Sequence, residues 1–440
     1  MARVTRRPQR RPSRPAAESG RRAVLRICGL GAQGDGIAEL AGRPVFVPFA
    51  GPGDLVEVAI EGPKGQGLAG RLVAILESGP GRAAPPCRHF GDCGGCAVQH
   101  LDEPGYADWK AGLLPEALAR RGFGPAPIRP LVRVAPGSRR RAALSAVRRG
   151  DRVLLGFHAR ARHRVVDLLD CRILLPQLVK LLPPLRSSLA HVIADGRTAD
   201  LILTWTESGA DLLILSTAAP ALAGRQALAA FAETADLARI AWSLPEGEPE
   251  PIAFRRPPLL HFGAVPVRLP PGAFLQPSAE GEAALVSAVL EGLAGAARVA
   301  DLFAGCGTFS FPAAAAGARV HAVDGAGPAI DALAAAARAA ELGPVVGAER
   351  RDLEARPLIG PELARHDAVV FDPPRAGAKA QAEQLARSQV PRIVAVSCNP
   401  ATFARDARIL AEGGYRLDWI QPVDQFPWTG HLELVAAFAR

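Results

Sequence analysis

The sequence is short of several residue types, and each shortage limits what the protein can be. Asparagine occurs once, at position 399, and lysine occurs only at 64, 110, 180 and 379. Alanine, glycine and proline are abundant, so the excess of arginine over lysine indicates a codon bias and is a weak sign of binding. Charged or turn residues interrupt every apolar stretch before about 18 residues, and the start of the chain lacks a signal-peptide pattern. We therefore expect no membrane association and a cytoplasmic location.

The cysteines are few and unevenly spread, at positions 28, 87, 93, 96, 171, 306 and 398. An odd number in a long chain argues against a disulfide framework and for metal binding or catalysis. A chain of 440 residues is also too long for one core, so we expect two or three domains.

The positive charge is concentrated at the start of the chain. Residues 1–22 hold eight arginines and one acid, Glu18, and so contribute +7 of the formal +9. A Pro- and Arg-rich segment cannot bury apolar surface, so we predict a disordered tail that either attracts phosphates or is merely solvated. Pro8, Pro12 and Pro15 would break the amphipathic helix of a mitochondrial presequence.

Three further regions follow the tail. Residues 23–80 alternate short apolar runs with glycine turns, which predicts a small OB-like β-barrel of four or five strands. Residues 85–270 mix strand and helix signals and are predicted to form an α+β central domain. From residue 271 to 440, strand, glycine turn and alanine-rich helix repeat. This pattern predicts an α/β domain, a doubly wound parallel sheet of the Rossmann type.

The first strand of that domain ends in a glycine turn that suggests a nucleotide-like ligand. Residues 298–303 form the strand and residues 304–309, Ala-Gly-Cys-Gly-Thr-Phe, form the turn. Asp324 ends the next strand, where an acid hydrogen-bonds ribose hydroxyls. A dinucleotide fold is the competitor, but Ser310 replaces its third glycine and Asp301 would repel a pyrophosphate. S-adenosylmethionine, which has a ribose and a cationic centre but no phosphate, fits better.

Two more acids follow later strands. Asp352 follows a weak strand and is a candidate to accept a hydrogen bond from the adenine amino group, although a solvated loop acid explains it as well. Asp372 opens the run Asp372-Pro373-Pro374-Arg375, which is similar to the Asp-Pro-Pro of amino methyltransferases. Those enzymes continue with an aromatic residue that stacks on the base, and Arg375 cannot do this. Amino methylation is therefore disfavoured, while Asp372 remains a candidate to hold cofactor or substrate.

The apolar run 393–397 predicts a buried strand with Cys398 at its carboxyl end, where open α/β sheets bind ligands. The alternative is a small core residue followed by a turn. Glu433 lies in an otherwise apolar strand, 431–435, where an acid is costly without a role. A thiolate that adds to uracil carbon-6 makes carbon-5 nucleophilic, and a base must then remove the carbon-5 proton. Cys398 and Glu433 fit these two roles, while His431 is better interpreted as a surface or structural residue.

These motifs together resemble the RNA uracil-5-methyltransferase family. The resemblance rests on Ser397–Pro400, on Asp424–Glu433 and on the Asp-Pro-Pro-Arg run. It implies that Cys398 is the nucleophile and Glu433 the base. It also implies that Gln276, Phe303, Asp324 and Asp372 bind S-adenosylmethionine or position the uracil. The family commonly has asparagine two residues after the glutamine, where this chain has Ser278.

The remaining cysteines form a second motif, Cys87-(x5)-Cys93-(x2)-Cys96, with Cys171 farther on. Four such ligands hold zinc or an iron–sulfur cluster, and spacing alone favours zinc. The sequence around 87–100 is similar to the [4Fe-4S] loop of bacterial uracil-5-methyltransferases that act on 23S ribosomal RNA. This resemblance favours an iron–sulfur cluster over zinc. Residues 23–78 resemble a TRAM domain, an RNA-binding β-barrel.

The sequence therefore predicts an enzyme that methylates uracil carbon-5 in RNA, with 23S rRNA favoured over tRNA by the resemblance. A non-catalytic RNA-binding protein built on a retired methyltransferase fold is the alternative from another class. A cytosine-5 methyltransferase shares the thiolate chemistry but has different motifs around its cysteine. A monomer is the default expectation.

Overall fold

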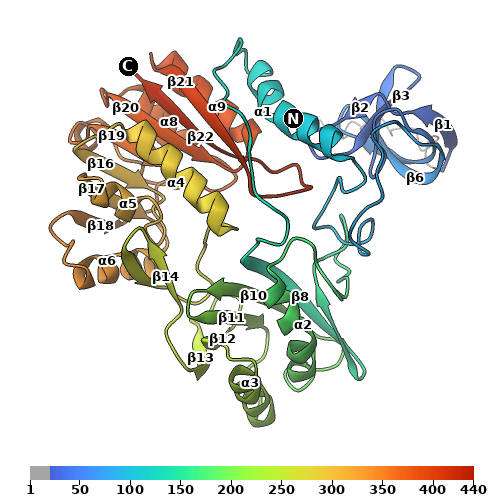
Figure 1. The fold of residues 1–440 in the computed structure, drawn as a ribbon, viewed down its shortest axis with the longest axis horizontal. Helices are drawn as coiled ribbons and strands as arrows, with labels where there is room; N and C mark the ends of the chain where they lie inside the picture. Colours follow the sequence, from blue (N-terminus) through green and yellow to red (C-terminus); the bar gives the residue numbers. More distant parts are fainter. Residues whose placement is uncertain (1–19) are drawn as a thin grey trace, which may run out of the picture. The chain divides into compact units, whose positions relative to one another are not determined.

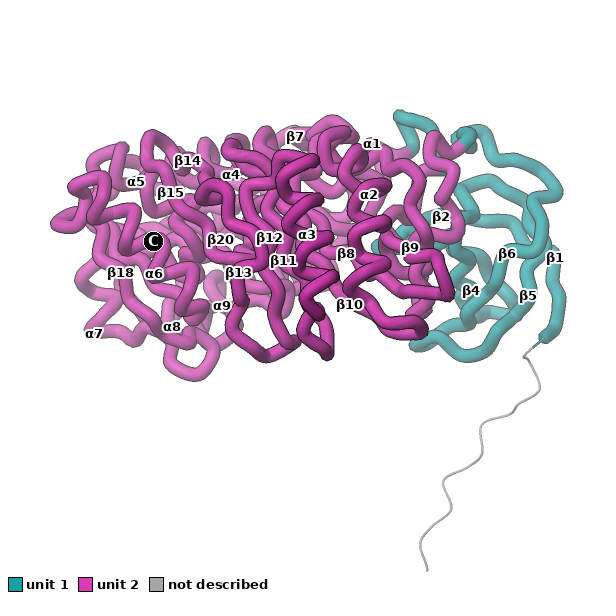
Figure 2. Tube along the Cα trace, turned by 90° about the horizontal axis from the view of Figure 1, so that it is seen from below, with its two compact units in different colours: residues 1–84, 100–105 teal, residues 85–99, 106–440 magenta. Residues whose placement is uncertain are grey.

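The computed structural model describes residues 20–440, which form two compact units (Figure 2). Unit 1 contains the described residues up to 84 together with residues 100–105, and unit 2 contains residues 85–99 and 106–440. Most of the predicted tail, residues 1–19, lies outside the described residues. Its last residue, Arg22, already belongs to the first strand. The predicted central and C-terminal regions both belong to unit 2.

Unit 1 is a six-stranded sheet in the order β1-β5-β6-β4-β3-β2. Its strands are β1 (Arg22–Arg26), β2 (Gly29–Leu30), β3 (Gly36–Leu40), β4 (Arg43–Val47), β5 (Leu55–Lys64) and β6 (Gly67–Glu77). Alternate residues such as Val56 and Val58 are buried in its apolar core. The expectation of four or five strands missed β2, because two residues between glycines carry no period-2 signal.

The first part of unit 2 contains a six-stranded mixed sheet in the order β13-β12-β11-β10-β8-β9. Its strands are β8 (Arg141–Arg149), β9 (Arg152–Gly156), β10 (Thr198–Thr206), β11 (Gly209–Ser216), β12 (Arg239–Ser243) and β13 (Glu250–Phe254). Helices α2 (Pro176–Leu189) and α3 (Leu222–Thr234) contribute Leu182, Leu185 and Leu228 to the same apolar cluster as Leu201 and Leu212 of the sheet. This arrangement agrees with the mixed α+β expectation.

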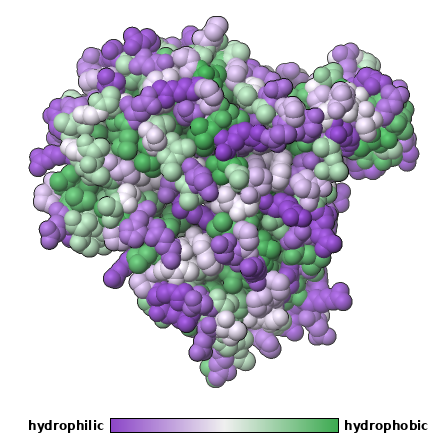
Figure 3. Space-filling view, in the orientation of Figure 1, coloured by the Kyte–Doolittle hydropathy of each residue, from purple (hydrophilic) through white to green (hydrophobic). Residues whose placement is uncertain are grey.

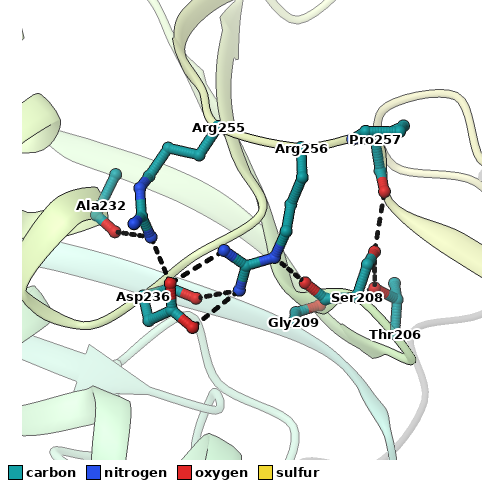
Figure 4. A network of polar contacts seen from close by, with 8 residues as sticks. All are labelled: Thr206, Ser208, Gly209, Ala232, Asp236, Arg255, Arg256 and Pro257. Carbon is teal, nitrogen blue, oxygen red and sulfur yellow. Dashed lines mark hydrogen bonds and ion pairs between the residues drawn. The ribbon is translucent and has the colours of Figure 1, made fainter.

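A polar network fixes the chain where it leaves this sheet (Figure 4). Asp236, which follows α3, accepts hydrogen bonds from Arg255 and from Arg256. Arg256 also donates to the Ser208 carbonyl in the β10–β11 turn, and the Ser208 hydroxyl donates to the Pro257 carbonyl at 2.8 Å. Arg256, and then Arg255, lower the pKa of the Asp236 carboxyl to about 2. The Asp236 carboxylate therefore holds both arginines that follow β13, and Arg256 in turn holds the β10–β11 turn.

The second part of unit 2 is built on an eight-stranded sheet in the order β18-β17-β16-β19-β20-β22-β21-β7 (Figure 1). A hairpin of β14 (Leu259–Phe262) and β15 (Val265–Arg268) precedes it. The sheet strands are β7 (Val132–Arg133), β16 (Arg298–Leu302), β17 (Arg319–Asp324), β18 (Val346–Arg350), β19 (Ala368–Phe371), β20 (Arg392–Ser397), β21 (Arg416–Asp424) and β22 (Glu433–Ala439). Strands β16 to β20 are parallel, and β22 is antiparallel between β20 and β21.

Helices cover both faces of this sheet, as a doubly wound fold requires. They are α1 (Glu103–Ala119), α4 (Ala279–Leu293), α5 (Ser310–Ala315), α6 (Gly327–Ala339), α7 (Gly360–Leu363), α8 (Lys379–Ala386) and α9 (Pro400–Glu412). Val299 and Ala300 are neighbours on β16 but belong to different apolar clusters, one with Leu285 of α4 and one with Leu410 of α9. Because successive strand residues face opposite sides, the two clusters are the two faces. The predicted α/β class is confirmed.

The surface of the described residues is mixed in character. Figure 3 shows hydrophilic and hydrophobic residues intermixed on the visible face. Across residues 20–440, no helix combines the length and the apolar character needed to span a bilayer.

A buried ion pair in the central sheet gives a stability prediction. Arg239 donates two hydrogen bonds to Asp211, at 2.8 and 2.7 Å, and both residues are buried. We predict that Asp211→Ala lowers the free energy of unfolding by about 3–5 kcal/mol, because a buried guanidinium loses its partner. Urea denaturation followed by tryptophan fluorescence measures this, since Trp205 and Trp242 lie in the same sheet.

The matched control is Glu250→Ala, which removes a carboxylate 3.5 Å from Arg225 in a largely exposed pair. We expect it to cost less than about 1 kcal/mol. Equal losses for the two variants would contradict the assignment of this stability to burial.

Candidate active site

The sheet register brings Cys398 and Glu433 together. Cys398 immediately follows β20, and Glu433 opens β22. These strands are antiparallel, and Ser397 pairs with Leu434, so the next step along the ladder sets Cys398 across from Glu433. Residues directly opposite in such a pair project on the same face, with Cβ atoms about 5 Å apart. The predicted strand 431–435 in fact begins at Glu433, because His431 belongs to the loop before it.

A chain of amides and carboxylates lies beside this pair. Gln276 Nε2 donates to Asp372 Oδ2 at 3.1 Å, and Gln425 Nε2 donates to Gln276 Oε1 at 2.7 Å. Gln276, Gln425 and Glu433 are each no more than 3% exposed. Two of these side chains, Gln276 and Asp372, were predicted to act at one site although 96 residues separate them. Gln425 was not predicted, because nothing in the sequence around it shows that it is buried.

Burial dominates the protonation of the site. Desolvation, and then the Asp372 charge, raise the pKa of Glu433 well above its usual value, while a hydrogen bond from Gln425 lowers it. Desolvation, and then Glu433 and Asp372, raise the pKa of the Cys398 thiol to about 12. Desolvation also raises the pKa of Asp372 to about 7. At neutral pH the thiol is therefore neutral until a positive charge approaches.

Arg375 is the positive group that acts on this pair. It lowers the pKa of both Cys398 and Glu433, and its Nη2 lies 2.7 Å from His431 Nδ1. Desolvation, and then Arg375, lower the pKa of His431 to about 4, so a neutral imidazole accepts this hydrogen bond. The Arg375 carbonyl accepts from Asn399 Nδ2 at 3.3 Å and from Thr402 Oγ1 at 3.2 Å. His431 is thus a structural partner of Arg375.

The single asparagine of the chain has two structural tasks. Its Oδ1 accepts from the Ala401 amide at 3.1 Å and caps α9, while its amide nitrogen holds the loop of Arg375. Ser278 likewise caps α4, accepting from the Gly281 amide at 3.1 Å. At the position where the family commonly has asparagine, the Ser278 hydroxyl therefore acts as the N-cap of α4.

The glycine turn after β16 is held by Asp324. Its Oδ2 accepts from the Gly305 amide at 2.8 Å, and its Oδ1 accepts from the Ala326 amide at 2.6 Å. Gly305 has a φ of 56°, and a Cβ built there would meet nothing within 4 Å. The backbone of the turn is therefore open to a ligand at this point.

Asp301 lies under this turn and is 1% exposed. Ser310 donates to its Oδ2 at 2.5 Å, while its Oδ1 has no hydrogen-bond partner among the described residues. Desolvation raises the pKa of Asp301 to about 7, and the charges of Asp372 and Asp324 add to this shift. A buried acid with an unsatisfied oxygen fits a cationic ligand and disfavours a phosphate.

Phe303 and Asp352 are placed differently from the other predicted cofactor residues. Phe303 adopts a φ of 62°, which is strained for an aromatic residue, and it lines a cavity of about 360 Å³ together with Leu353 and Gly377. Asp352 is exposed, and its Oδ1 accepts from the Glu354 and Ala355 amides at 2.9 and 3.2 Å. Of the five predicted cofactor residues, Phe303 lines this cavity and the other four do not.

The predicted metal ligands lie within electrostatic range of one another. The pKa of Cys93 is raised to about 11 and that of Cys96 to about 12, chiefly by desolvation, and the neighbouring thiols Cys171 and Cys87 contribute to both shifts. Within residues 20–440, however, no three histidine, cysteine or acidic side chains form a group that could hold a metal ion. The predicted cluster is therefore not confirmed.

Comparisons with known proteins agree with this geometry. A profile of the tRNA (Uracil-5-)-methyltransferase family matches residues 264–439. An uncharacterized RNA methyltransferase of Brucella suis is 42% identical, over 96% of this chain and 99% of that protein. The 23S rRNA (uracil(1939)-C(5))-methyltransferase RlmD of Halomonas elongata is 37% identical, over 96% of this chain and 90% of that protein. The chain belongs to the RNA uracil-5-methyltransferase family.

A solved structure supports the same conclusion. Pyrococcus abyssi tRNA (uracil-54, C5)-methyltransferase, in complex with S-adenosyl-L-homocysteine, superposes on this methyltransferase with a TM-score of 0.75. The two chains are 25% identical, and the match covers 94% of this chain and 99% of that one.

The electrostatics of this methyltransferase make a prediction about the Cys398 thiol. At pH 8, iodoacetamide should modify Cys398 about three- to ten-fold faster in Glu433→Gln and slower by a similar factor in Arg375→Gln. Loss of the carboxylate removes a charge that opposes the thiolate, and loss of the guanidinium removes one that favours it. Mass spectrometry of the peptide that contains Cys398 measures the rates.

Glu412→Gln on the exposed end of α9 is the control, and its rate should equal that of the wild type. If Glu433→Gln and Arg375→Gln changed the rate in the same direction, altered packing would be the cause and the electrostatic account would be wrong.

Proposed function

We propose that this protein transfers the methyl group of S-adenosylmethionine to uracil carbon-5 in RNA, with Cys398 as nucleophile and Glu433 as base. The observation that carries the proposal is the β20–β22 register, which ends with Ser397 paired to Leu434 and so brings the next thiol, Cys398, close to the buried carboxyl of Glu433 at the carboxyl edge of the sheet. Open α/β sheets bind their ligands at this edge. Neither group has another evident structural task in the described chain.

Each step of the reaction assigns a change to one of these groups. The Cys398 thiolate forms a bond to uracil carbon-6, and the electrons of the carbon-5–carbon-6 double bond move toward carbon-5 and the carbonyl. The cosubstrate supplies an electrophilic methyl group on a sulfonium. Once carbon-5 carries that methyl, the Glu433 carboxylate removes the carbon-5 proton, the double bond returns and the Cys398 sulfur leaves.

The residues around the pair support these steps. Gln276 and Asp372, joined by a 3.1 Å hydrogen bond, offer the amide and carboxyl groups that would hold a uracil edge or the cosubstrate. Asp324 and the open backbone at Gly305 would hold a ribose. The cavity beside Phe303 offers a largely apolar lining for an adenine ring, and Asp352 directly precedes Leu353, which lines this cavity.

We propose 23S rRNA as the substrate, with tRNA as the alternative. The Halomonas relative that acts on 23S rRNA is 37% identical, against 25% for the archaeal tRNA enzyme. The β-sheet of unit 1 would contribute RNA binding as a TRAM domain does. A paired or stacked target uracil would have to leave the helix, which costs least in an RNA loop.

We also propose that Cys87, Cys93, Cys96 and Cys171 hold a [4Fe-4S] cluster, with zinc as the alternative. Neighbouring cysteines raise the pKa of Cys93, Cys96 and Cys171, and Cys87 is among the causes for each of the three. The four thiols are therefore neighbours, and a thiolate there would be costly without a cation. The cluster would tie the loop that carries three of these cysteines to the loop of Cys171. The spacing does not match that of radical enzymes, so we assign it a structural or RNA-positioning role.

The reaction predicts opposite defects for the two catalytic residues. Cys398→Ala should form no covalent complex with RNA and no 5-methyluridine, because the bond to carbon-6 cannot form. Glu433→Gln should form the covalent complex and keep it, because the carbon-5 proton stays. Denaturing gels of protein mixed with a uridine-containing RNA loop and S-adenosylmethionine measure the complex.

Nucleoside mass spectrometry of 23S rRNA and tRNA from a deletion strain identifies the substrate. A 5-methyluridine that returns with the wild-type gene and not with Cys398→Ala would support the proposal. Retention of every 5-methyluridine in the deletion strain, together with an inactive purified protein, would reject it.

The cysteine site makes a separate prediction. Protein purified without oxygen should contain about four irons and show the visible absorption of an iron–sulfur cluster. Cys96→Ser should lose both signals, while Cys28→Ser in unit 1 should retain them. One zinc and no iron in the wild type would favour a zinc site over the iron–sulfur cluster.

A further inference from the structure

The residues between β21 and Glu433 lack regular structure, although Glu433 depends on their position. We give the name base segment to residues 424–431, which are the last residue of β21 and the seven residues that follow it. It contains Gln425, whose amide bonds Gln276 and whose hydrogen bond lowers the pKa of Glu433. It also contains Trp428, which adopts a φ of 59°. A non-glycine residue in this region is strained and needs its surroundings to hold it.

Lys110 of α1 holds the base segment at three points. Its ammonium donates to the Phe426 carbonyl at 3.0 Å and to the Thr429 carbonyl at 2.8 Å, and it lies 2.7 Å from Asp424 Oδ1. Its side chain is 0% exposed. An ammonium has three donors and is costly to bury unless each is used. A lysine that directs all three at one short segment fixes the path of that segment.

Tyr106, one helical turn before Lys110, bonds the same segment. Its hydroxyl donates to Asp424 Oδ2 and accepts from the Trp428 amide at 3.1 Å. Tyr106 is 2% exposed, so water does not replace these bonds. The bond to Trp428 acts directly on the strained residue.

The loop that carries the cysteine motif reaches the other side of Trp428. The amides of Ala97 and Val98, which directly follow Cys96, donate to the Trp428 carbonyl at 2.7 and 3.3 Å. The same loop is tied to the central sheet, since the Gly94 amide donates to the His158 carbonyl at 2.9 Å. Both peptide groups of Trp428 are thus bonded to residues more than 300 positions away in the sequence.

We propose that Tyr106 and Lys110 are positioning residues for Glu433, and that the cysteine loop acts on the same base segment through Trp428. The inference rests on the proposed function, because it assigns Glu433 as the base. It makes the cysteine site part of the catalytic geometry: a change in the cysteine loop would shift Trp428 and with it Gln425. Gln425 would then lose its hydrogen bonds to Gln276 and Glu433.

The two tyrosines of the chain provide a matched test. Tyr106→Phe removes the hydroxyl bonded to the base segment. Tyr415 is an equally buried residue, and Tyr415→Phe removes a hydroxyl that donates to the Val390 carbonyl at 2.8 Å. Tyr415 directly precedes β21, at the end of that strand that pairs with Ala439 and is opposite to the end that pairs with Glu433. The first variant should increase hydrogen exchange at the Trp428 amide about ten-fold, because it loses its acceptor. The second should leave that amide unchanged.

The same pair is then compared in the reaction with RNA and S-adenosylmethionine. Tyr106→Phe should lower kcat with little change in KM and should raise the fraction of protein trapped covalently on RNA, because proton removal slows while the thiol still adds. Tyr415→Phe should match the wild type in both. Identical exchange and identical trapping in the two variants would overturn the proposal.

Failure of the proposed function would look different. In that case the wild type would make no 5-methyluridine, while the exchange rates would still report on how the base segment is held. A second arm tests the cysteine loop: Cys96→Ser should increase exchange across residues 428–431 while β20 exchanges at the wild-type rate. Unchanged exchange in 428–431 would remove the cysteine loop from the proposal.

Discussion

The desolvation of acidic groups at one edge of the sheet is the constraint on which the site depends. Asp301, Asp372, Glu433 and Cys398 are close enough that the charge of one raises the pKa of another. Water would normally screen such groups, but here burial is the largest cause of each shift. The folded site therefore holds its protons near neutral pH. It is built to receive positive charge.

The topology explains why these groups meet. Insertion of antiparallel β22 between β20 and β21 sets the start of one strand beside the end of its neighbour, so Glu433, near the C-terminus, faces the end of β20 that carries Cys398. Parallel β16 and β19 end at the same edge and bring Phe303 and Asp372 there. The two strained backbones of this region, at Phe303 and Trp428, flank the same edge. Such strain persists where surrounding bonds over-determine it, as they do at Trp428.

Local sequence signals predicted the parts of the site that lie on strands. The ends of β19 and β20 were found because apolar runs stop there, and Cys398 and Glu433 stood out as reactive groups against apolar neighbours. Contacts between distant residues left no such signal. Lys110 is buried only because its partners lie 314 to 319 residues away, and a lysine in a helix otherwise indicates solvent. Gln425 is hidden for the same reason, and Gln276 was found only through the family resemblance.

The charge balance of the site has a consequence for the order of the proposed reaction. A sulfonium near Asp372 would favour the ionised carboxylates and the thiolate, since positive charge lowers the pKa of each. Before that, the raised pKa favours the neutral thiol at Cys398, and a neutral thiol is a poor nucleophile. Arg375 alone does not overcome burial, because the thiol pKa remains raised in its presence. A nucleophile that is activated only when its cosubstrate is bound would add to uracil only where a methyl group is ready to transfer. The raised pKa would then limit adducts that cannot proceed to product.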